Sequence, residues 1–252
     1  MSFAVAADAY DRFMGRYSRP LAPQLADFAG VRAGQRVVDV GCGPGALTSE
    51  LVARLGAEAI VAADPSEPFV EAARERHPGV EVALAPAEDL PFDDDAFDAA
   101  LAQLVVHFMS DPVAGLAEMR RVTRAGGVVA ASVWDHVGEQ SPLAPFWRAA
   151  RELHPDVPDE SGLAGTREGH LAELLAQAGL RDVEDDAHSV RVEHDSFEEW
   201  WEPFTLGVGP AGAFVAGLDA EATQELREHC RRMLGDGPIV IPARAWAARG
   251  RA

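Results

Sequence analysis

A short apolar run that ends in a glycine-rich turn constrains the fold of this chain most strongly. Residues Val37–Val40 are followed by Gly41, Gly43 and Gly45, and then by an amphipathic segment over 46–55. A β-branched apolar run bounded by glycine and proline is typical of a buried parallel strand. A second apolar run then ends in an acid at Asp64. Glycines at the carboxyl end of a strand let a ligand approach bare backbone, so an adenosine-bearing cofactor is the first expectation.

Beyond this turn, predicted strands alternate with predicted helices. Strands are expected over 37–40, 59–64, 80–84, 97–103, 128–134, 183–192 and 238–246, and helices over 67–76, 113–122 and 167–178. Prolines interrupt the last strand, which we therefore place at or near an edge. The alternation predicts an α/β fold with a doubly wound, mostly parallel, seven-stranded sheet covered by helices on both faces.

The two ends of the chain predict additions to this sheet. Residues 5–29 have apolar positions at helical spacing with a break at Arg19-Pro20, which predicts a two-helix cap. Residues 197–218 are aromatic and then glycine-rich, and a polar helix is expected over 220–234, so this part resembles a lid insertion. We expect a single domain over 1–252, divided into a helical cap (1–30), a cofactor-binding core (31–135) and substrate-side, lid and final-strand elements (136–252).

Charge and cysteine content exclude several partners. Lys and Arg number 22 against 41 Asp and Glu, which gives a formal net charge of −19. Such a chain repels phosphate backbones and anionic membranes, so neither nucleic acid nor membrane is expected as a partner. Two isolated cysteines, Cys42 and Cys230, fit a reducing compartment, and no stretch resembles a signal peptide or a membrane span. We expect a cytoplasmic monomer or homodimer.

The glycine turn by itself leaves its ligand open. Gly41-x-Gly43-x-x-Ala46 is a loose dinucleotide fingerprint, and such a turn can also serve only to pack a helix against a sheet. Burial of the Asp39 carboxylate inside an apolar strand costs free energy unless the turn donates hydrogen bonds to it or a cationic ligand group pairs with it. Asp64 ends the next strand, where its two oxygens can accept both hydroxyls of a ribose. The loop 86–92 follows the third strand, within reach of an adenine edge.

Five motifs in order strengthen the cofactor interpretation. They are Val-Asp-Val-Gly-Cys-Gly-Pro-Gly at 38–45, Ala-Asp-Pro-Ser at 63–66, Ala-Glu-Asp-Leu-Pro-Phe at 87–92, Phe-Asp at 97–98 and Arg-Val-Thr-Arg-Ala-Gly-Gly at 121–127. In these motifs the chain resembles the Rossmann-like S-adenosylmethionine-dependent methyltransferases, especially the small-molecule group of ubiquinone and menaquinone biosynthesis. Residues 10–18 are similar to the cap that precedes that core, so the resemblance covers about the first half of the chain.

The resemblance implies a role for particular residues at an S-adenosyl-L-methionine site. Its implied contacts are Gly41, Gly43 and Gly45 at the methionine portion, with Asp39 also binding the cofactor; Asp64, Pro65 and Ser66 at the ribose; Ala87 and Glu88 at the adenine; Gln103 at the sulfonium; and Tyr10, Arg16 and Tyr17 closing the cap over the carboxylate. Pro86 stands where the family usually has an aspartate that accepts from the adenine amino group. Adenine recognition is therefore the part of the site that departs from the family.

Catalytic and substrate residues are less constrained. A sulfonium already carries an activated methyl group, so alignment and exclusion of water can suffice for transfer. His107 is a candidate general base for an acidic acceptor, with a structural histidine as the alternative. Trp134, at the end of the fifth strand, can contact the substrate or fill the core. Trp200 and Trp201 can form an aromatic lid, with core packing as the alternative.

No metal site is predicted. The run 93–95 of three aspartates fits a solvated turn, because consecutive side chains point in different directions. His188 and His194 have no Cys or His nearby at ligand spacing.

The sequence therefore predicts a methyltransferase that uses S-adenosyl-L-methionine, releases S-adenosyl-L-homocysteine and acts on a small-molecule acceptor. An NAD(P)-dependent oxidoreductase would share the glycine turn and Asp64, but it gives Asp39 no role, and the chain has no Tyr and Lys at helical spacing to supply a proton. A non-catalytic cofactor-binding module is the third interpretation, motivated by Pro86.

Overall fold

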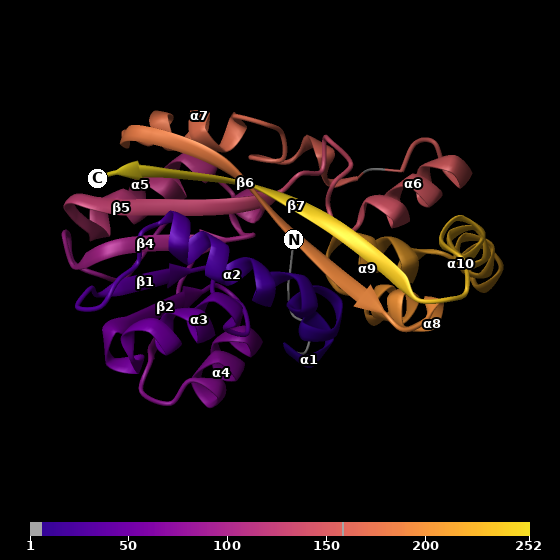
Figure 1. Cartoon of the computed structure of the whole chain (residues 1–252), viewed down its shortest axis with the longest axis horizontal. Coiled ribbons are helices and arrows are strands. Elements are labelled where there is room, and N and C mark those ends of the chain that lie inside the picture. The colour runs from indigo at the N-terminus through magenta and orange to yellow at the C-terminus, as the bar shows by residue number, and fades with distance from the viewer. Residues whose placement is uncertain (1–6, 158) are drawn as a thin grey trace.

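The computed structural model describes residues 7–157 and 159–252, and it contains a seven-stranded sheet of order β3-β2-β1-β4-β5-β7-β6 (Figure 1). The strands are β1 (Val37–Val40), β2 (Ile60–Asp64), β3 (Glu81–Leu84), β4 (Phe97–Gln103), β5 (Thr123–Trp134), β6 (Arg181–His194) and β7 (Ile239–Arg251). β1 to β5 pair in parallel, whereas β7 runs antiparallel to both of its neighbours, β5 and β6. The predicted doubly wound, mostly parallel sheet is confirmed.

Helices follow most strands of this sheet. They are α1 (Ala7–Tyr10), the π-helical η1 (Asp11–Gly15), α2 (Arg16–Phe28), α3 (Ala46–Leu55), η2 (Ala57–Ala59), α4 (Glu67–Arg76), η3 (Val106–Phe108), α5 (Pro112–Val122), α6 (Ala144–Leu153), η4 (Glu160–Gly162), α7 (His170–Gln177), α8 (Phe197–Trp201), η5 (Glu202–Leu206), α9 (Gly209–Gly217) and α10 (Ala220–Leu234). The helix α6 was not predicted from the sequence, although its buried face carries Phe146 and Trp147.

Alternating side chains of the strands divide the core between the two faces of the sheet. In β1, Val38 and Val40 belong to an apolar cluster shared with α5 and α7, whereas Val37 belongs to one shared with α2, α3 and α4. Successive strand residues point to opposite faces, so Asp39 faces the same side as Val37. This alternation brings Asp39 against α3, where it meets Thr48.

A third apolar cluster lies beyond the sheet. β6 and β7 extend past the other strands and carry α8, α9 and α10 at their far ends (Figure 1). Aromatic side chains of α6, α8 and η5 fill this region, including Phe146, Trp200, Trp201 and Phe204. The insertion predicted as a lid between the last two strands is therefore a packed helical subdomain joined to the sheet.

Two local predictions rest on proline, and the structure contradicts one of them. The predicted break at Arg19-Pro20 is wrong: α2 continues through Pro20, and burial of Leu21 and Leu25 holds it against the sheet. The predicted position of the last strand at or near an edge is confirmed, because β7 lies one strand inside the edge strand β6. Pro242 is tolerated there because it lies beyond the end of β5, where β7 pairs with β6 alone.

No helix within the described ranges is long and apolar enough to cross a membrane.

Candidate functional site

A cleft of about 600 Å³ opens beyond the carboxyl ends of β1, β2, β3 and β4. This is the edge at which open α/β sheets bind ligands, and the volume lies within the usual range for small-molecule sites. Many of its lining residues were predicted to bind a cofactor, namely Tyr10, Gly41, Gly43, Asp64, Pro65, Ser66, Ala87, Glu88 and Gln103. Four predicted cofactor residues do not line the cleft: Arg16, Tyr17, Asp39 and Gly45.

The glycine turn after β1 requires glycine for two separate reasons. Gly41 has φ +70°, and a Cβ atom there would lie 2.3 Å from Cγ2 of Val105. Gly45 has φ +97° at the N-cap position of α3, and a Cβ atom there would lie 2.5 Å from Nε2 of His77. Left-handed φ disfavours a side chain at both positions, and the close neighbours add a steric clash. The turn therefore presents bare backbone to the cleft at Gly41, whereas Gly45 starts the helix behind it.

Asp64 organises the two loops that flank the cleft. Its Oδ2 accepts a hydrogen bond from the amide of Gly43 at 2.8 Å, and its Oδ1 accepts one from the amide of Ser66 at 2.8 Å. Burial raises the pKa of Asp64, and these two backbone hydrogen bonds oppose that effect. Each carboxylate oxygen has a further lone pair, so the residue can still accept hydroxyl donors from a ligand in the cleft. Its predicted contact with a ribose stays a prediction.

Asp39 lies beneath the turn rather than in the cleft lining. The hydroxyl of Thr48 donates to Oδ2 at 2.6 Å, while Oδ1 is buried without a hydrogen-bond partner in the described part of the chain. Burial raises the pKa of Asp39 to about 7, an effect that the Thr48 hydrogen bond reduces and the charge of Asp64 increases. A buried carboxylate oxygen without a partner is rare and marks a place where a ligand or water is expected.

The loop after β3 has Pro86, Ala87 and Glu88 in the cleft lining. Oε1 of Glu88 accepts hydrogen bonds from the amides of Ser110 at 2.6 Å and Asp111 at 3.1 Å. This carboxylate therefore holds the segment before α5, a role that the sequence did not indicate.

Gln103 marks the end of β4 at the floor of the cleft. Its Nε2 donates to the carbonyl of Ser18 at 3.0 Å, and its Oε1 is buried without a partner among the described residues. The side chain thus joins α2 to the cleft and leaves one acceptor atom for a ligand.

The three cap residues divide into two groups. Tyr10 lines the cleft, packs edge-on against Phe69 at 5.2 Å between ring centroids, and has its pKa raised by burial and by the charge of Asp64. Arg16 instead contacts Nδ1 of His194 at 2.7 Å and donates to Glu199 at 2.8 Å. The hydroxyl of Tyr17 contacts Nε2 of the same histidine at 2.8 Å. Arg16 and Tyr17 therefore tie α2 to β6 and α8, and their predicted cofactor contact is absent from this arrangement.

A second, smaller cavity of about 30 Å³ adjoins the cleft, and Tyr10, Leu104 and Phe108 line both. The smaller one is also lined by His107 and Trp134, which were candidates for a base and for substrate contact. Its remaining lining residues are Phe13, Met14, Leu143, Glu160, Val208, Gly209 and Pro210. Nε1 of Trp134 is buried without a hydrogen-bond partner in the described chain, so a residue that lines this mainly apolar cavity has an unused donor.

Leu104 forms the boundary between the two cavities and was missed by the sequence analysis. It directly follows β4 and has φ +61°, which is unusual for a residue with a branched side chain. Strained backbone of this kind clusters at functional sites. The local sequence does not predict this left-handed conformation, because glycine or asparagine is its usual signal.

Trp200 and Trp201 line neither cavity. They are 2% and 4% exposed and belong to the apolar cluster formed with α6 and η5. The ring of Trp200 lies 4.9 Å from that of Phe204, and Trp201 stacks on Phe197 at 6.2 Å. The structure therefore gives both tryptophans the packing role, and their assignment as substrate contacts is corrected accordingly.

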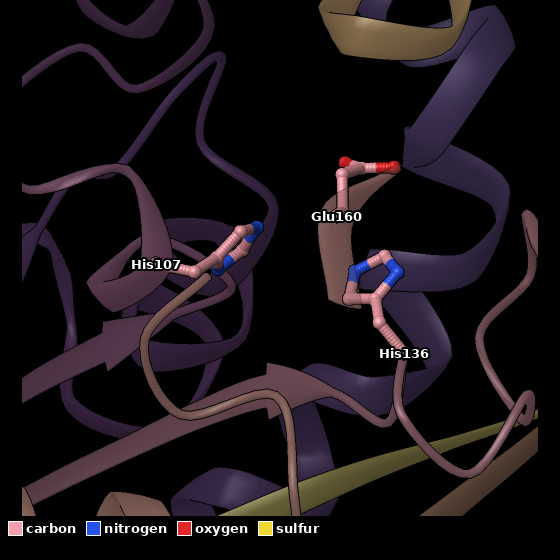
Figure 2. Close-up of side chains that lie close together, drawn as sticks. All are labelled: His107, His136 and Glu160. Atoms are coloured by element: carbon pink, nitrogen blue, oxygen red, sulfur yellow. The ribbon is translucent and has the colours of Figure 1, made fainter. Parts of the chain in front are cut away.

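Three buried side chains beside the smaller cavity converge from distant parts of the chain: His107 of η3, His136 after β5 and Glu160 of η4 (Figure 2). One ligand-type atom from each lies within 4.8 Å of the others. Burial lowers the pKa of His107 well below its ordinary range and that of His136 to about 4, and raises that of Glu160 to about 7. The sequence predicts no metal site here, because these three residues lie far apart in the chain and form no motif of short ligand spacing.

Comparisons with known proteins support the predicted family. A family model described as a methyltransferase domain matches residues 38–131. An uncharacterised methyltransferase of Mycobacterium tuberculosis is 39% identical over 127 residues, which are 50% of this chain and 49% of that protein. A demethylmenaquinone methyltransferase of Paenarthrobacter aurescens is 30% identical over 177 residues, covering 63% of this chain and 67% of the relative. The chain thus spans about half the length of the mycobacterial relative.

A solved structure supports the fold over the whole chain. An N-methyltransferase of Haemonchus contortus, in complex with phosphomonomethylethanolamine and S-adenosylhomocysteine, covers 100% of this chain with 60% of its own length. The TM-score is 0.58 at 16% identity, which indicates a shared fold. These comparisons give no support to the nicotinamide-dependent alternative.

Proposed function

Because this chain belongs to the Rossmann-like S-adenosylmethionine-dependent methyltransferases similar to quinone-biosynthesis enzymes, we propose that it transfers a methyl group from S-adenosyl-L-methionine to a small molecule. One observation carries the proposal. A cleft of cofactor size, with bare glycine backbone at one end, adjoins a mainly apolar cavity across Leu104.

The residues of the cleft fit the cofactor in charge and in hydrogen-bonding capacity. Gly41 and Gly43 let the methionine portion lie against backbone, and Asp64 retains acceptor capacity for ribose hydroxyls. Asp39 has a buried oxygen without a partner in the described ranges, and Gln103 has another. Asp39 does not line the cleft, so a cationic ligand there would act on it through charge and would stabilise its ionised form. These residues would therefore hold a positively charged nucleoside.

The cofactor supplies an activated methyl group when bound, and the protein needs to orient the acceptor and exclude water. Orientation of this kind can contribute about 7–11 kcal/mol to a transfer step. The smaller cavity provides the apolar walls, and Leu104 and Phe108 border it on the cleft side. A general base at His107 stays a prediction, since alignment alone can support the reaction.

The lining of the smaller cavity supports one class of acceptor. Its walls include the rings of Phe13, Phe108 and Trp134, which suit an apolar or aromatic molecule with one acceptor atom facing Nε1 of Trp134. The cavity is about 30 Å³, so a ring-sized acceptor enters only if some of its lining residues move. The similarity to a demethylmenaquinone methyltransferase supports this class.

Methyl transfer is tested directly with the full chain and cofactor carrying an isotopically labelled methyl group. Phenols, quinols and amines are supplied separately, and labelled product is detected by mass spectrometry. We expect label in an aromatic acceptor and thermal stabilisation by S-adenosyl-L-methionine and S-adenosyl-L-homocysteine. Stabilisation by NAD alone would reject the proposal, and tight cofactor binding without any transfer would favour the non-catalytic module.

A substitution at the acceptor cavity connects this reaction to the structure. Trp134→Phe removes the unpartnered Nε1 and keeps the ring, so cofactor affinity should persist while KM for the acceptor rises. Trp246→Phe is the matched control, because Nε1 of that indole is likewise buried without a partner in the described chain and Trp246 lines neither cavity. An unchanged KM in Trp134→Phe would remove this indole from acceptor recognition.

We further propose that the protein acts in the cytoplasm as a monomer or homodimer, without a nucleic-acid or membrane partner. The net charge of −19 supports the exclusion of anionic polymers and membranes.

A further inference from the structure

The cluster His107, His136 and Glu160 has the donor set of a metal site and has no part in the proposed cofactor contacts. Two imidazoles and one carboxylate form the protein ligands of several zinc and non-haem iron centres. In Figure 2 the three side chains come from separate elements of the chain and lie close together. A single ion could therefore contact all three without a change in the course of the backbone.

Buried nitrogen atoms without partners indicate that this cluster binds a ligand. The three residues are 6%, 7% and 3% exposed, respectively. Nδ1 of His107 and Nε2 of His136 are buried, and neither has a hydrogen-bond partner in the part of the chain that the structure describes. A buried ring nitrogen without a hydrogen-bond partner lowers the stability of the folded protein. Two such nitrogens in one cluster indicate a ligand that accepts an electron pair from each of them.

The carboxylate of this group is already oriented by a neighbour. Nε1 of Trp147 donates to Oε2 of Glu160 at 2.8 Å. Outer hydrogen bonds of this kind commonly fix a metal-binding carboxylate and leave its other oxygen for the ion. The nearest further acids are already engaged, since Asp135 pairs with Arg244 and Asp159 with Arg151. The cluster thus supplies three ligands rather than a larger set of acids.

The surroundings leave room for a ligand from solution. His107 and Glu160 line the cavity of about 30 Å³, which is large enough for one or two water molecules. Metal sites with three protein ligands and an open position are typical of centres that bind water or substrate.

We propose that His107, His136 and Glu160 bind one divalent transition-metal ion of the kind that imidazole and carboxylate ligands prefer, such as Zn²⁺ or Fe²⁺. The ion occupies the space between the three side chains and has its open position toward the smaller cavity. A consequence that rests on the proposed function is that an oxygen atom of the acceptor can bind the ion. His107 would then be committed to the metal, which excludes it as a general base.

Metal binding is tested on the full chain without cofactor or acceptor, so its outcome is independent of methyl transfer. The chain is stripped with a chelator and titrated with Zn²⁺ by calorimetry, and Co²⁺ is added separately because its visible spectrum reports nitrogen and oxygen ligation. Mg²⁺ serves as the hard-ion comparison, since it prefers oxygen ligands. We expect one Zn²⁺ per chain and a Co²⁺ spectrum indicating imidazole ligation.

Variants assign the ion to this cluster. His136→Asn and Glu160→Gln should each weaken Zn²⁺ binding about tenfold or more, since even outer-shell changes at metal sites have effects of 10–100-fold. His188→Asn is the matched control, because His188 is another buried histidine with an unpartnered ring nitrogen within the described ranges. Circular dichroism of each variant verifies folding. Absence of Zn²⁺ binding by the wild-type chain, or binding that survives both cluster substitutions, would overturn the proposal.

Discussion

The buried carboxylate of Asp39 should make the stability of the ligand-free protein depend on pH. Burial raises its pKa from 3.8 to about 7, which corresponds to about 4 kcal/mol in favour of the protonated form. The folded state therefore holds a proton that the unfolded chain has already released at pH 4–7. The free energy of unfolding should therefore fall as pH rises through this window. Above about pH 7, Asp39 should cause no further decrease.

Asp39→Asn isolates this contribution, because the amide oxygen can still accept the hydrogen bond from Thr48. Between pH 5 and pH 8 the variant should gain about 2–3 kcal/mol of stability relative to the wild type. Urea unfolding of both proteins at the two pH values, followed by circular dichroism, measures the difference. Asp98→Asn is the control: the backbone amide of Arg36 and the side chain of Arg124 lower the pKa of Asp98, so this carboxylate is ionised in both states and its substitution should cost the same stability at the two pH values.

The same residue links stability to the proposed ligand. A cation bound near Asp39 would favour its ionised form, so binding of S-adenosyl-L-methionine at pH 6 should release a proton. Calorimetry in buffers of different ionisation enthalpy detects that proton, and Asp39→Asn should abolish it. If the variant and the wild type have parallel stability profiles from pH 5 to pH 8, the reasoning about this carboxylate is refuted.

Three further substitutions test the cleft and the packed subdomain. Gly41→Ala should lower the free energy of unfolding in urea more than Gly43→Ala does. Both glycines have positive φ, but only a Cβ at position 41 would clash with Val105. Equal losses of stability in the two variants would contradict this steric argument. Asp64→Asn replaces one carboxylate oxygen by an amide nitrogen, which cannot accept a hydrogen bond from the turn. Stability should therefore fall by about 1–3 kcal/mol, and the affinity for S-adenosyl-L-methionine should fall at least tenfold. An unchanged affinity in calorimetry would contradict the assignment of Asp64 to the cofactor site. Trp200→Ala should cost about 3–5 kcal/mol of stability while the folded variant keeps its cofactor affinity, and loss of affinity without loss of stability would instead place it at the site.

The sequence by itself determined the first half of the fold and the position of the cleft. The run 37–40, its glycines and Asp64 are adjacent in the chain, so local rules of strand burial and positive φ apply to them directly. Parallel strands then bring their carboxyl ends to one edge, which is why most of the predicted cofactor residues line a single cleft.

Only the tertiary structure decided which distant side chains meet. Arg16 and Tyr17 form hydrogen bonds with His194, which is 178 and 177 residues further along the chain, and that pairing removes them from the cleft lining. His107 and Glu160 face each other although more than fifty residues separate them in the sequence. Such contacts depend on how complete helices and strands pack, and packing is set by the whole buried surface rather than by the residues near each site.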